Sequence, residues 1–135
     1  MNIRNINAAI EDYTALQETV LLLNELGVPQ KLAGRRYIQS AVVLLVENRG
    51  LKLGMSKAVY NRLSREHGAS TLGIMRSVRC AVDATWKRGN RQALREYFGG
   101  DDVYSPTNTE FIARLRDIVM LRILNLTEST DDSIA

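Results

Sequence analysis

The chain has 135 residues, of which 45% are hydrophobic and 24% are charged, and its formal net charge is +3 at pH 7. This is the composition of an ordinary globular protein, and the length suits one domain that closes a single core. The lone cysteine excludes an internal disulfide and a zinc site of several thiolates, and no apolar run approaches the roughly 20 residues that span a bilayer.

The N-terminal region predicts a helix that follows a polar start. Residues 1–9 are polar and have no signal-peptide pattern, so we expect a cytoplasmic protein. Asn7 can cap a helix that runs towards Leu26. Gly27 and Pro29 then end this helix, because glycine suits the left-handed C-terminal position and proline cannot continue a helix. The predicted apolar stripe consists of Ile10, Tyr13, Leu16, Val20 and Leu23.

A second helix is predicted from about Ala33 to Asn48. The run AVVLLV at residues 41–46 is apolar on nearly every side, which is typical of a buried helix. A buried strand is the alternative, given the β-branched valines, but the length of the flanking polar pattern favours a helix. We expect this segment to be the central core helix.

Residues 55–90 have the pattern of a helix-turn-helix motif. Ser56 is the expected cap of a first helix, a tight turn follows at Gly68, and a longer helix runs from about Ser70 to Lys87. The inward side chains of the first helix are predicted to be Val59, Tyr60 and Leu63.

The longer helix of this motif has two unlike faces. One face has apolar or small residues at helical spacing and can face a core: Ile74, Val78, Ala81, Val82 and Thr85. The opposite face has Arg76, Arg79, Asp83 and Lys87, with Met75 and Cys80 at its margin. Arg76 and Arg79 are three residues apart, so they project from one face about a turn apart. An arginine fork can bind the two acceptors of a guanine edge in the major groove.

Positive charge is concentrated around the motif. Residues 49–95 contain eleven Lys and Arg against two acidic residues, a net charge of +9, so the rest of the chain sums to −6. Such a region suits a polyanion, because each neutralised phosphate releases counterions. The alternative is a solvated helical hairpin with a basic surface, and the pattern alone gives the two interpretations similar weight.

The sequence after the motif predicts a short helix and a loop. The helix runs from Arg91 to Phe98 and ends at Gly99-Gly100, and residues 101–106 form the loop. Trp86, which precedes the short helix, is expected to bury its indole against the core, where its N–H needs a partner.

A last helix is predicted from Phe111 to about Leu126. Thr107 or Asn108 is the expected cap, with Glu110 in the first turn. Ten large apolar residues in this helix are more than one stripe needs, so part of its surface is expected to bind a partner. The polar, acidic residues 127–135 are predicted to be disordered.

The residue pattern offers little for catalysis. We find no glycine-rich phosphate loop and no cluster of metal ligands, so we predict no enzyme, no cofactor and no metal. His67, the only histidine, lies beside the turn, where a surface or phosphate-contacting role is expected. Cys80 is more typical of a small helix residue than of a nucleophile, and Asp101-Asp102 is a loop pair rather than a carboxylate dyad.

Several short strings occur in a distinctive order and spacing: Leu26-Gly27-Val28-Pro29 with Gly34 and Tyr37-Ile38, Ser56-Lys57 with Tyr60, Arg76 with Arg79, Trp86 with Arg88-Gly89-Asn90, Phe98-Gly99, and Pro106-Thr107-Asn108 with Glu110-Phe111-Ile112-Ala113. Through them, residues 20–122 resemble the DNA-binding effector domain of the stage zero sporulation protein A family of sporulation response regulators. The resemblance implies a single all-α domain of six helices with an embedded helix-turn-helix, whose second helix enters the major groove. We therefore divide the chain into a partly helical extension (1–19), this domain (20–126) and the tail (127–135).

The resemblance also implies roles for particular residues. Base readers would be Arg76 and Arg79, with Met75 at a position where the family has a carboxylate. Phosphate contacts would come from Lys57, Arg62, Arg65, Cys80, Lys87 and Arg88, with Cys80 at a position where the family has a histidine beside the DNA. The last helix of the family joins neighbouring copies on tandem boxes, so we expect homodimerisation through Phe111, Leu115, Ile118, Leu121 and Arg122.

The sequence thus predicts a bacterial, nucleoid-associated transcriptional regulator that binds double-stranded DNA in a sequence-specific way. The family protein has a phosphorylatable receiver domain, whereas residues 1–19 contain no receiver sheet, so we expect activity without that switch. The alternative is a protein-interaction module that forms a heterodimer with a full-length regulator and modulates or blocks it.

Overall fold

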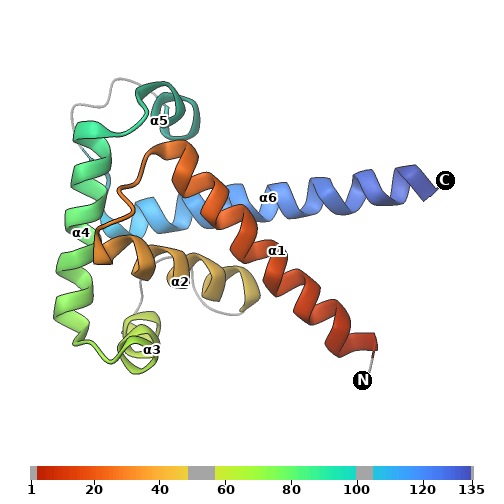
Figure 1. Ribbon diagram of the computed structural model, residues 1–135, viewed down its shortest axis with the longest axis horizontal. Helices are drawn as coiled ribbons and strands as arrows, with labels where there is room; N and C mark the ends of the chain where they lie inside the picture. Colours follow the sequence, from red (N-terminus) through yellow and green to blue (C-terminus); the bar gives the residue numbers. More distant parts are fainter. Residues whose placement is uncertain (1–2, 49–56, 100–104, 135) are drawn as a thin grey trace.

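The computed structural model describes residues 3–48, 57–99 and 105–134, and the side chains of residues 13–48, 57–99 and 105–126. This part of the chain contains helices α1 (Ile3–Leu26), α2 (Ala33–Glu47), α3 (Lys57–His67), α4 (Thr71–Arg88), α5 (Arg91–Phe98) and α6 (Asn108–Ile134) (Figure 1). The predicted six-helix, all-α fold is confirmed.

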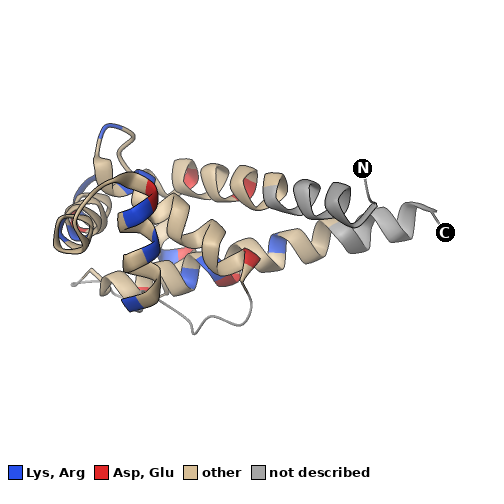
Figure 2. Cartoon of the chain, turned by 90° about the horizontal axis from the view of Figure 1, so that it is seen from below, with Lys and Arg blue, Asp and Glu red and all other residues tan. Residues whose placement is uncertain are grey.

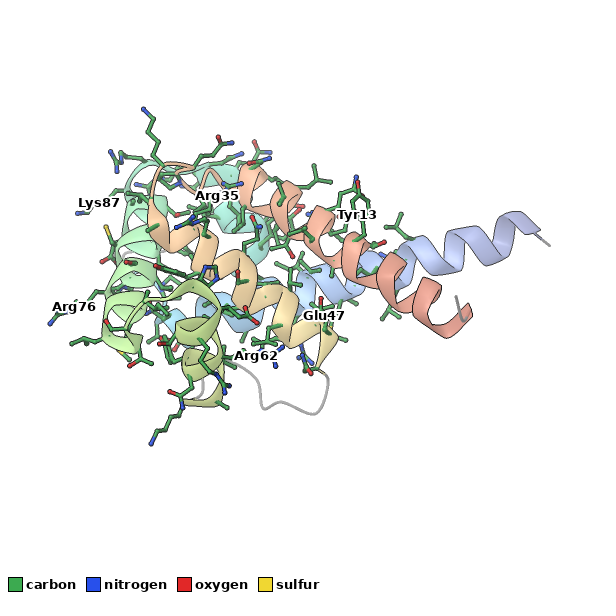
Figure 3. All side chains as sticks on the ribbon, turned by 60° about the horizontal axis from the view of Figure 1, so that its bottom comes forward. Tyr13, Arg35, Glu47, Arg62, Arg76 and Lys87 are labelled. Carbon is green, nitrogen blue, oxygen red and sulfur yellow. The ribbon has the colours of Figure 1, made fainter. Side chains whose placement is uncertain are left out.

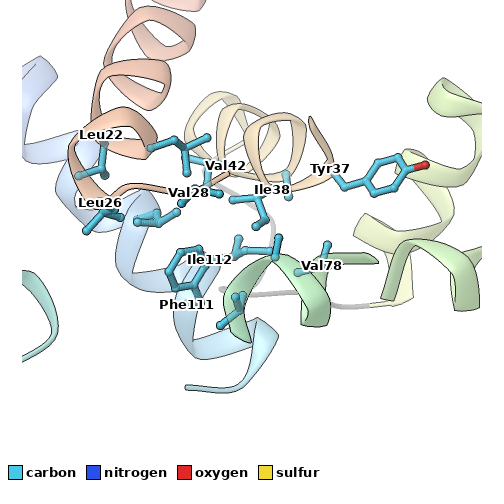
Figure 4. Close-up of a cluster of buried hydrophobic side chains, with 14 of the residues drawn as sticks. Leu22, Leu26, Val28, Tyr37, Ile38, Val42, Val78, Phe111 and Ile112 are labelled. Carbon is cyan, nitrogen blue, oxygen red and sulfur yellow. The ribbon is translucent and has the colours of Figure 1, made fainter. Parts of the chain in front are cut away.

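Helix α2 is the centre of the core, as its apolar sequence predicts. It packs against α1, α3, α4 and α6. Its Ile38 and Val42 are fully buried and lie among side chains from the surrounding helices (Figure 4). Burying a side chain of this size stabilises the fold by roughly 1.5–3 kcal/mol relative to leaving it in water. The segment is a helix, so the alternative of a buried strand is wrong.

Helices α2 and α4 cross closely at Gly34. A Cβ atom added to this glycine would collide with the backbone carbonyl of Ser77 and with the Cβ atom of Ala81. The missing side chain therefore lets the two backbones meet, and the crossing fixes α4 on the core.

A buried arginine holds the turn between α1 and α2. Arg35 donates from Nη1 to the carbonyl oxygen of Val28 and from Nη2 to Oδ1 of Asn24, both at 2.7 Å. Burial lowers the pKa of Arg35, but guanidinium remains charged at neutral pH. The sequence pattern gives no sign of this burial, since an arginine in an amphipathic helix normally faces water.

Helix α1 differs from its prediction in its start and in its buried face. It begins by Ile3, so Asn7 lies inside the helix and the predicted cap is wrong. Tyr13, at 67% exposure, and Leu16, at 40%, belong to the predicted stripe but face outward. The face that packs on the core consists of Ala15, Thr19, Leu22, Leu23 and Leu26. Thr19 counts as polar in a sequence pattern. Its hydroxyl, however, donates to the carbonyl oxygen of Ala15 at 2.7 Å, so it is buried with its hydrogen bond satisfied.

Helix α6 is longer than predicted, because it continues to Ile134 through residues 127–134, where the sequence predicts disorder. That segment contains no glycine or proline to stop a helix. Figure 1 shows the N-terminal half of α1 and the C-terminal half of α6 extending away from the body formed by the other helices. No helix within the described ranges is long and apolar enough to cross a membrane. The predicted cap Ser56 and the pair Asp101-Asp102 lie outside the described residues.

Candidate nucleic-acid interface

Helices α3 and α4 form the predicted helix-turn-helix. The turn contains Gly68, whose positive φ of 63° suits glycine, and Ser70 caps α4 by accepting a hydrogen bond from the amide of Gly73 at 3.0 Å. Buried side chains fix both helices on the core, and they include all those predicted: Val59, Tyr60 and Leu63 on α3, and Ile74, Val78, Ala81, Val82 and Thr85 on α4. The outward face of α4 is therefore set by the packing of its inward face.

The outward face of α4 is basic and accessible. Arg76, Lys87 and Arg88 are exposed, and Arg76 has no hydrogen-bond or ion-pair partner among the described residues. Figure 3 shows Arg76 and Lys87 pointing away from the body of the molecule. A shallow groove of about 700 Å³ along this face is lined by Arg76, Arg79, Cys80, Asp83, Ala84, Lys87 and Arg88. The thiol of Cys80 is free and exposed in this groove.

Arg79 has a different environment from Arg76, because each nitrogen of its guanidinium has a hydrogen-bond partner within the chain. Nε and Nη2 donate to Oδ1 of Asp83 at 3.2 and 2.8 Å, and Nη1 donates to the carbonyl oxygen of Pro106 at 2.8 Å. Nη2 also donates to Oγ of Ser105 at 2.9 Å, and this hydroxyl donates to Asp83 at 2.8 Å. The hydrogen bond from Arg79 lowers the pKa of Asp83, so its carboxylate is ionised at neutral pH. We call Arg79, Asp83, Ser105 and Pro106 the Arg79 clamp.

The start of α6 is attached to α4 next to this clamp. Asn108 donates from Nδ2 to the carbonyl oxygen of Met75 at 3.1 Å. Thr107 and Glu110 form a capping box, in which the amide of Glu110 donates to Oγ1 of Thr107 at 3.1 Å and the amide of Thr107 donates to Oε2 of Glu110 at 3.4 Å. The predicted cap is confirmed at Thr107, and α6 begins beside the outward face of α4.

Comparison with protein families shows that residues 19–119 match the family described as the C-terminal domain of the sporulation initiation factor Spo0A. The chain belongs to this family. The resemblance inferred from the short strings is thereby confirmed, and it identifies a family of DNA-binding regulatory domains. The helix-turn-helix and the basic face of α4 lie within the matched residues, whereas residues 3–18 of α1 and 120–134 of α6 lie outside them.

The basic residues Lys57, Arg62 and Arg65 of α3 are exposed, but not all of them lie beside the basic outward face of α4. Lys57 and Arg65 are exposed, as the family resemblance suggests. Arg62 pairs with Glu66 at 3.0 Å and lines a separate groove between α1, α2 and α3. Both partners of this pair are about half exposed, so the ion pair adds little stability. The Lys and Arg residues of the described part of the chain are distributed over several helices, as the blue segments of the cartoon in Figure 2 show.

His67 packs against α2. A hydrogen bond of 3.0 Å links its Nε2 to Oγ of Ser40, and its ring meets the edge of Tyr37 with centroids 5.1 Å apart. These contacts give it a role in joining α3 to α2, which differs from the expected surface role.

Three of the predicted dimerisation residues fill the core of the chain. Phe111 and Leu115 are fully buried and Ile118 is 8% exposed, so these side chains cannot also form a surface for a second copy. Arg122 donates to Glu25 at 2.9 Å and to the hydroxyl of Tyr97 at 2.8 Å. Leu121 is exposed at 61% and is the one apolar residue of the set that faces outward. The number of apolar residues in a helix does not by itself reveal which face of α6 the other helices cover.

The indole of Trp86 is buried, as predicted, and its ring packs edge-on against Phe98 and Phe111. Its Nε1 has no hydrogen-bond partner among the described residues.

Proposed function

We propose that the chain is a sequence-specific DNA-binding transcriptional regulator in which α4 enters the major groove. The observation that carries this proposal is the accessible basic face of α4, held outward by a buried opposite face in a helix-turn-helix. A helix presented in this way fits the width of the major groove. Membership of a family of DNA-binding regulatory domains supports the same function.

The environments of the basic residues suggest a division of roles. Arg76 is exposed and is assigned to base reading, with Met75 beside it. Arg79 is engaged in the Arg79 clamp, so we assign it first to positioning α4 against the start of α6. Exposed side chains are available for the phosphates: Lys57, Arg65, Cys80, Lys87 and Arg88. Arg62 lines another groove and is the weakest member of the predicted phosphate set.

A salt titration tests DNA binding directly. The dissociation constant for a duplex is measured by fluorescence anisotropy across a range of salt concentrations. Six phosphate contacts would give a log–log slope of about −5, at roughly −0.9 per contact. The variant Lys87→Gln should lower the steepness by about one contact. The variant Lys31→Gln, which removes an exposed charge outside the motif, serves as the matched control. A flat slope or an absence of binding would contradict the proposal.

We further propose that two copies associate through the outward face of α6. Leu121 and Leu124, three residues apart on one side of the helix, are exposed there at 61% and 49%. Two copies on adjacent boxes would bind DNA more tightly than one, because the second contact becomes intramolecular. Nothing in this arrangement requires a phosphorylated receiver.

A further inference from the structure

Helix α4 leaves two large apolar side chains on its outward face. It contains six large apolar residues, and Ile74, Val78, Val82 and Trp86 are buried. The other two, Leu72 and Met75, are 52% and 42% exposed. A single exposed apolar residue is ordinary on a protein surface. Here, however, both exposed residues lie in the first two turns of the helix that carries the accessible Arg76.

Leu72, Met75 and Arg76 share one side of the helix. Residues three and four apart on a helix are neighbours, and Leu72 is three residues from Met75 and four from Arg76. Met75 and Arg76 also line a groove of about 620 Å³ together with Tyr60, Arg79 and residues 107–109. The hydrogen bond from Asn108 to the carbonyl oxygen of Met75 holds this turn of α4 in place. The two apolar side chains are thus presented from a fixed backbone.

The chemistry of this pair selects among the bases. Leucine has no hydrogen-bonding group and the thioether of methionine is a weak acceptor, so neither can bind the edge of cytosine, adenine or guanine strongly. Thymine alone presents an apolar group in the major groove, which is its C5 methyl. We propose that Leu72 and Met75 enclose the C5 methyl group of a thymine that lies near a guanine bound by Arg76. This inference rests on the proposed DNA-binding function. It adds that the base contacted by Leu72 and Met75 is thymine.

Helix geometry limits where the thymine lies. Four residues of helix rise by about 6 Å, which is less than two base steps of about 3.4 Å. The thymine therefore lies within about two base pairs of the guanine. A DNA site with a guanine and a nearby thymine would thus be read from two turns of α4, the guanine by Arg76 and the thymine by the apolar pair.

The experiment removes only the methyl group. The preferred site is selected from a duplex library with a randomised centre, and each thymine of that site is replaced in turn by deoxyuridine. Enclosing one methyl group is worth about fourfold in affinity. We expect deoxyuridine to raise the dissociation constant about fourfold at one or two positions near a guanine and to have no effect at the other thymines.

Protein variants connect the methyl effect to the two side chains. The double variant Leu72→Ala, Met75→Ala should bind the thymine and deoxyuridine duplexes equally, because the enclosing surface is gone. Leu21→Ala, which shortens an exposed leucine on α1, should keep the full difference. All the substituted side chains are at least 42% exposed, and circular dichroism confirms that each variant is folded.

The outcomes separate this inference from the function on which it rests. Selective DNA binding that is indifferent to deoxyuridine at every thymine overturns the inference and leaves the DNA-binding function in place. A methyl effect that survives in the double variant also overturns it. Failure to enrich any sequence, with no salt-dependent binding, overturns both.

Discussion

Arg76 and Arg79 lie one turn apart on α4, and the sequence alone gives them the same role. The structure separates them, because Arg76 is exposed and has no partner among the described residues, while each nitrogen of the Arg79 guanidinium has one. For Arg79 to bind a base it would have to give up hydrogen bonds to an ionised carboxylate, which are among the stronger ones in proteins. Arg79, the arginine nearest in sequence to the proposed base reader Arg76, is thus a structural link between α4 and the start of α6.

At this scale we predict that Arg76→Ala and Lys87→Ala weaken DNA binding differently. Loss of a bidentate base contact should cost about 1–3 kcal/mol on the preferred site and relax specificity at one position. Loss of a phosphate contact should weaken binding to all sequences alike and lower the salt slope by about one unit. Binding of both variants to the preferred and a scrambled duplex distinguishes the two. Equal losses on both duplexes for Arg76→Ala would show that it does not read a base.

The sequence pattern predicts the two helices of the motif, but it does not predict which contacts their side chains make. The turn glycine Gly68 and the apolar spacing are local signals, and both correctly indicated α3 and α4. The Arg79 clamp joins Asp83 to Ser105, which is 22 residues further along the chain, so no local signal could reveal it. The buried face of α1 does not follow from the pattern for a different reason: Thr19 is a polar residue, but its hydroxyl donates to a carbonyl oxygen of its own helix and the side chain can be buried.

Among the elements, the crossing of α2 and α4 depends most on a single residue. We predict that Gly34→Ala lowers the free energy of unfolding by about 1–3 kcal/mol, because the added methyl group must displace the backbone of α4. Urea denaturation measures the change. Gly68→Ala is the comparison, since it strains a residue with positive φ but its Cβ meets no atom within 4 Å. If Gly34→Ala is as stable as the wild type, the close approach of the helices is not required.

Three helices are joined by one ionic network that should respond to pH. The hydroxyl of Tyr97 on α5 donates to Glu25 on α1 at 2.7 Å, and Arg122 on α6 pairs with the same carboxylate at 2.9 Å. The hydrogen bond from Tyr97, together with Arg122, places the pKa of Glu25 below its ordinary value of 4.5. Such a group stabilises the fold above the unfolded-state pKa, and this contribution is lost as the pH falls through the folded-state pKa.

We therefore expect the Tm of the wild type to fall more steeply from about pH 6 to about pH 3 than that of Glu25→Gln. Glu96→Gln, which changes an exposed carboxylate on α5, should keep the wild-type profile. Thermal unfolding at several pH values provides the comparison. Parallel profiles for the wild type and Glu25→Gln would show that the network does not couple stability to pH.

For the whole molecule, the burial of α6 decides which variants can test self-association. Ile118 is in the core, so Ile118→Glu would report on folding rather than on assembly. Leu121→Glu places the charge on the exposed side, and we predict that it abolishes dimers on a two-box duplex while the monomer stays folded. Analytical ultracentrifugation with and without DNA measures this.

Leu21→Glu is the control for an added charge, since this leucine is 50% exposed on α1. We expect it to assemble as the wild type does. Loss of assembly in Leu21→Glu but not in Leu121→Glu would place the contact on α1 instead. A wild type that remains monomeric and fills two boxes independently would remove the proposal of self-association.

The attachment of α6 to α4 has a consequence for the spacing of binding sites. The helix starts at the Arg79 clamp and continues without a break for 27 residues, which is about 40 Å. Its segment from Asn108 to Leu121, about 20 Å long, is therefore a rigid spacer between the helix proposed to read DNA and the surface on which a second copy would dock. A flexible linker would tolerate boxes at many separations, whereas a rigid spacer sets both the distance and the rotational phase between two reading helices. Each extra base pair moves a box by about 3.4 Å and about a tenth of a turn. Cooperative binding should accordingly be confined to a narrow range of box separations. A change in the length of α6 between its start and the docking surface would change the permitted separation.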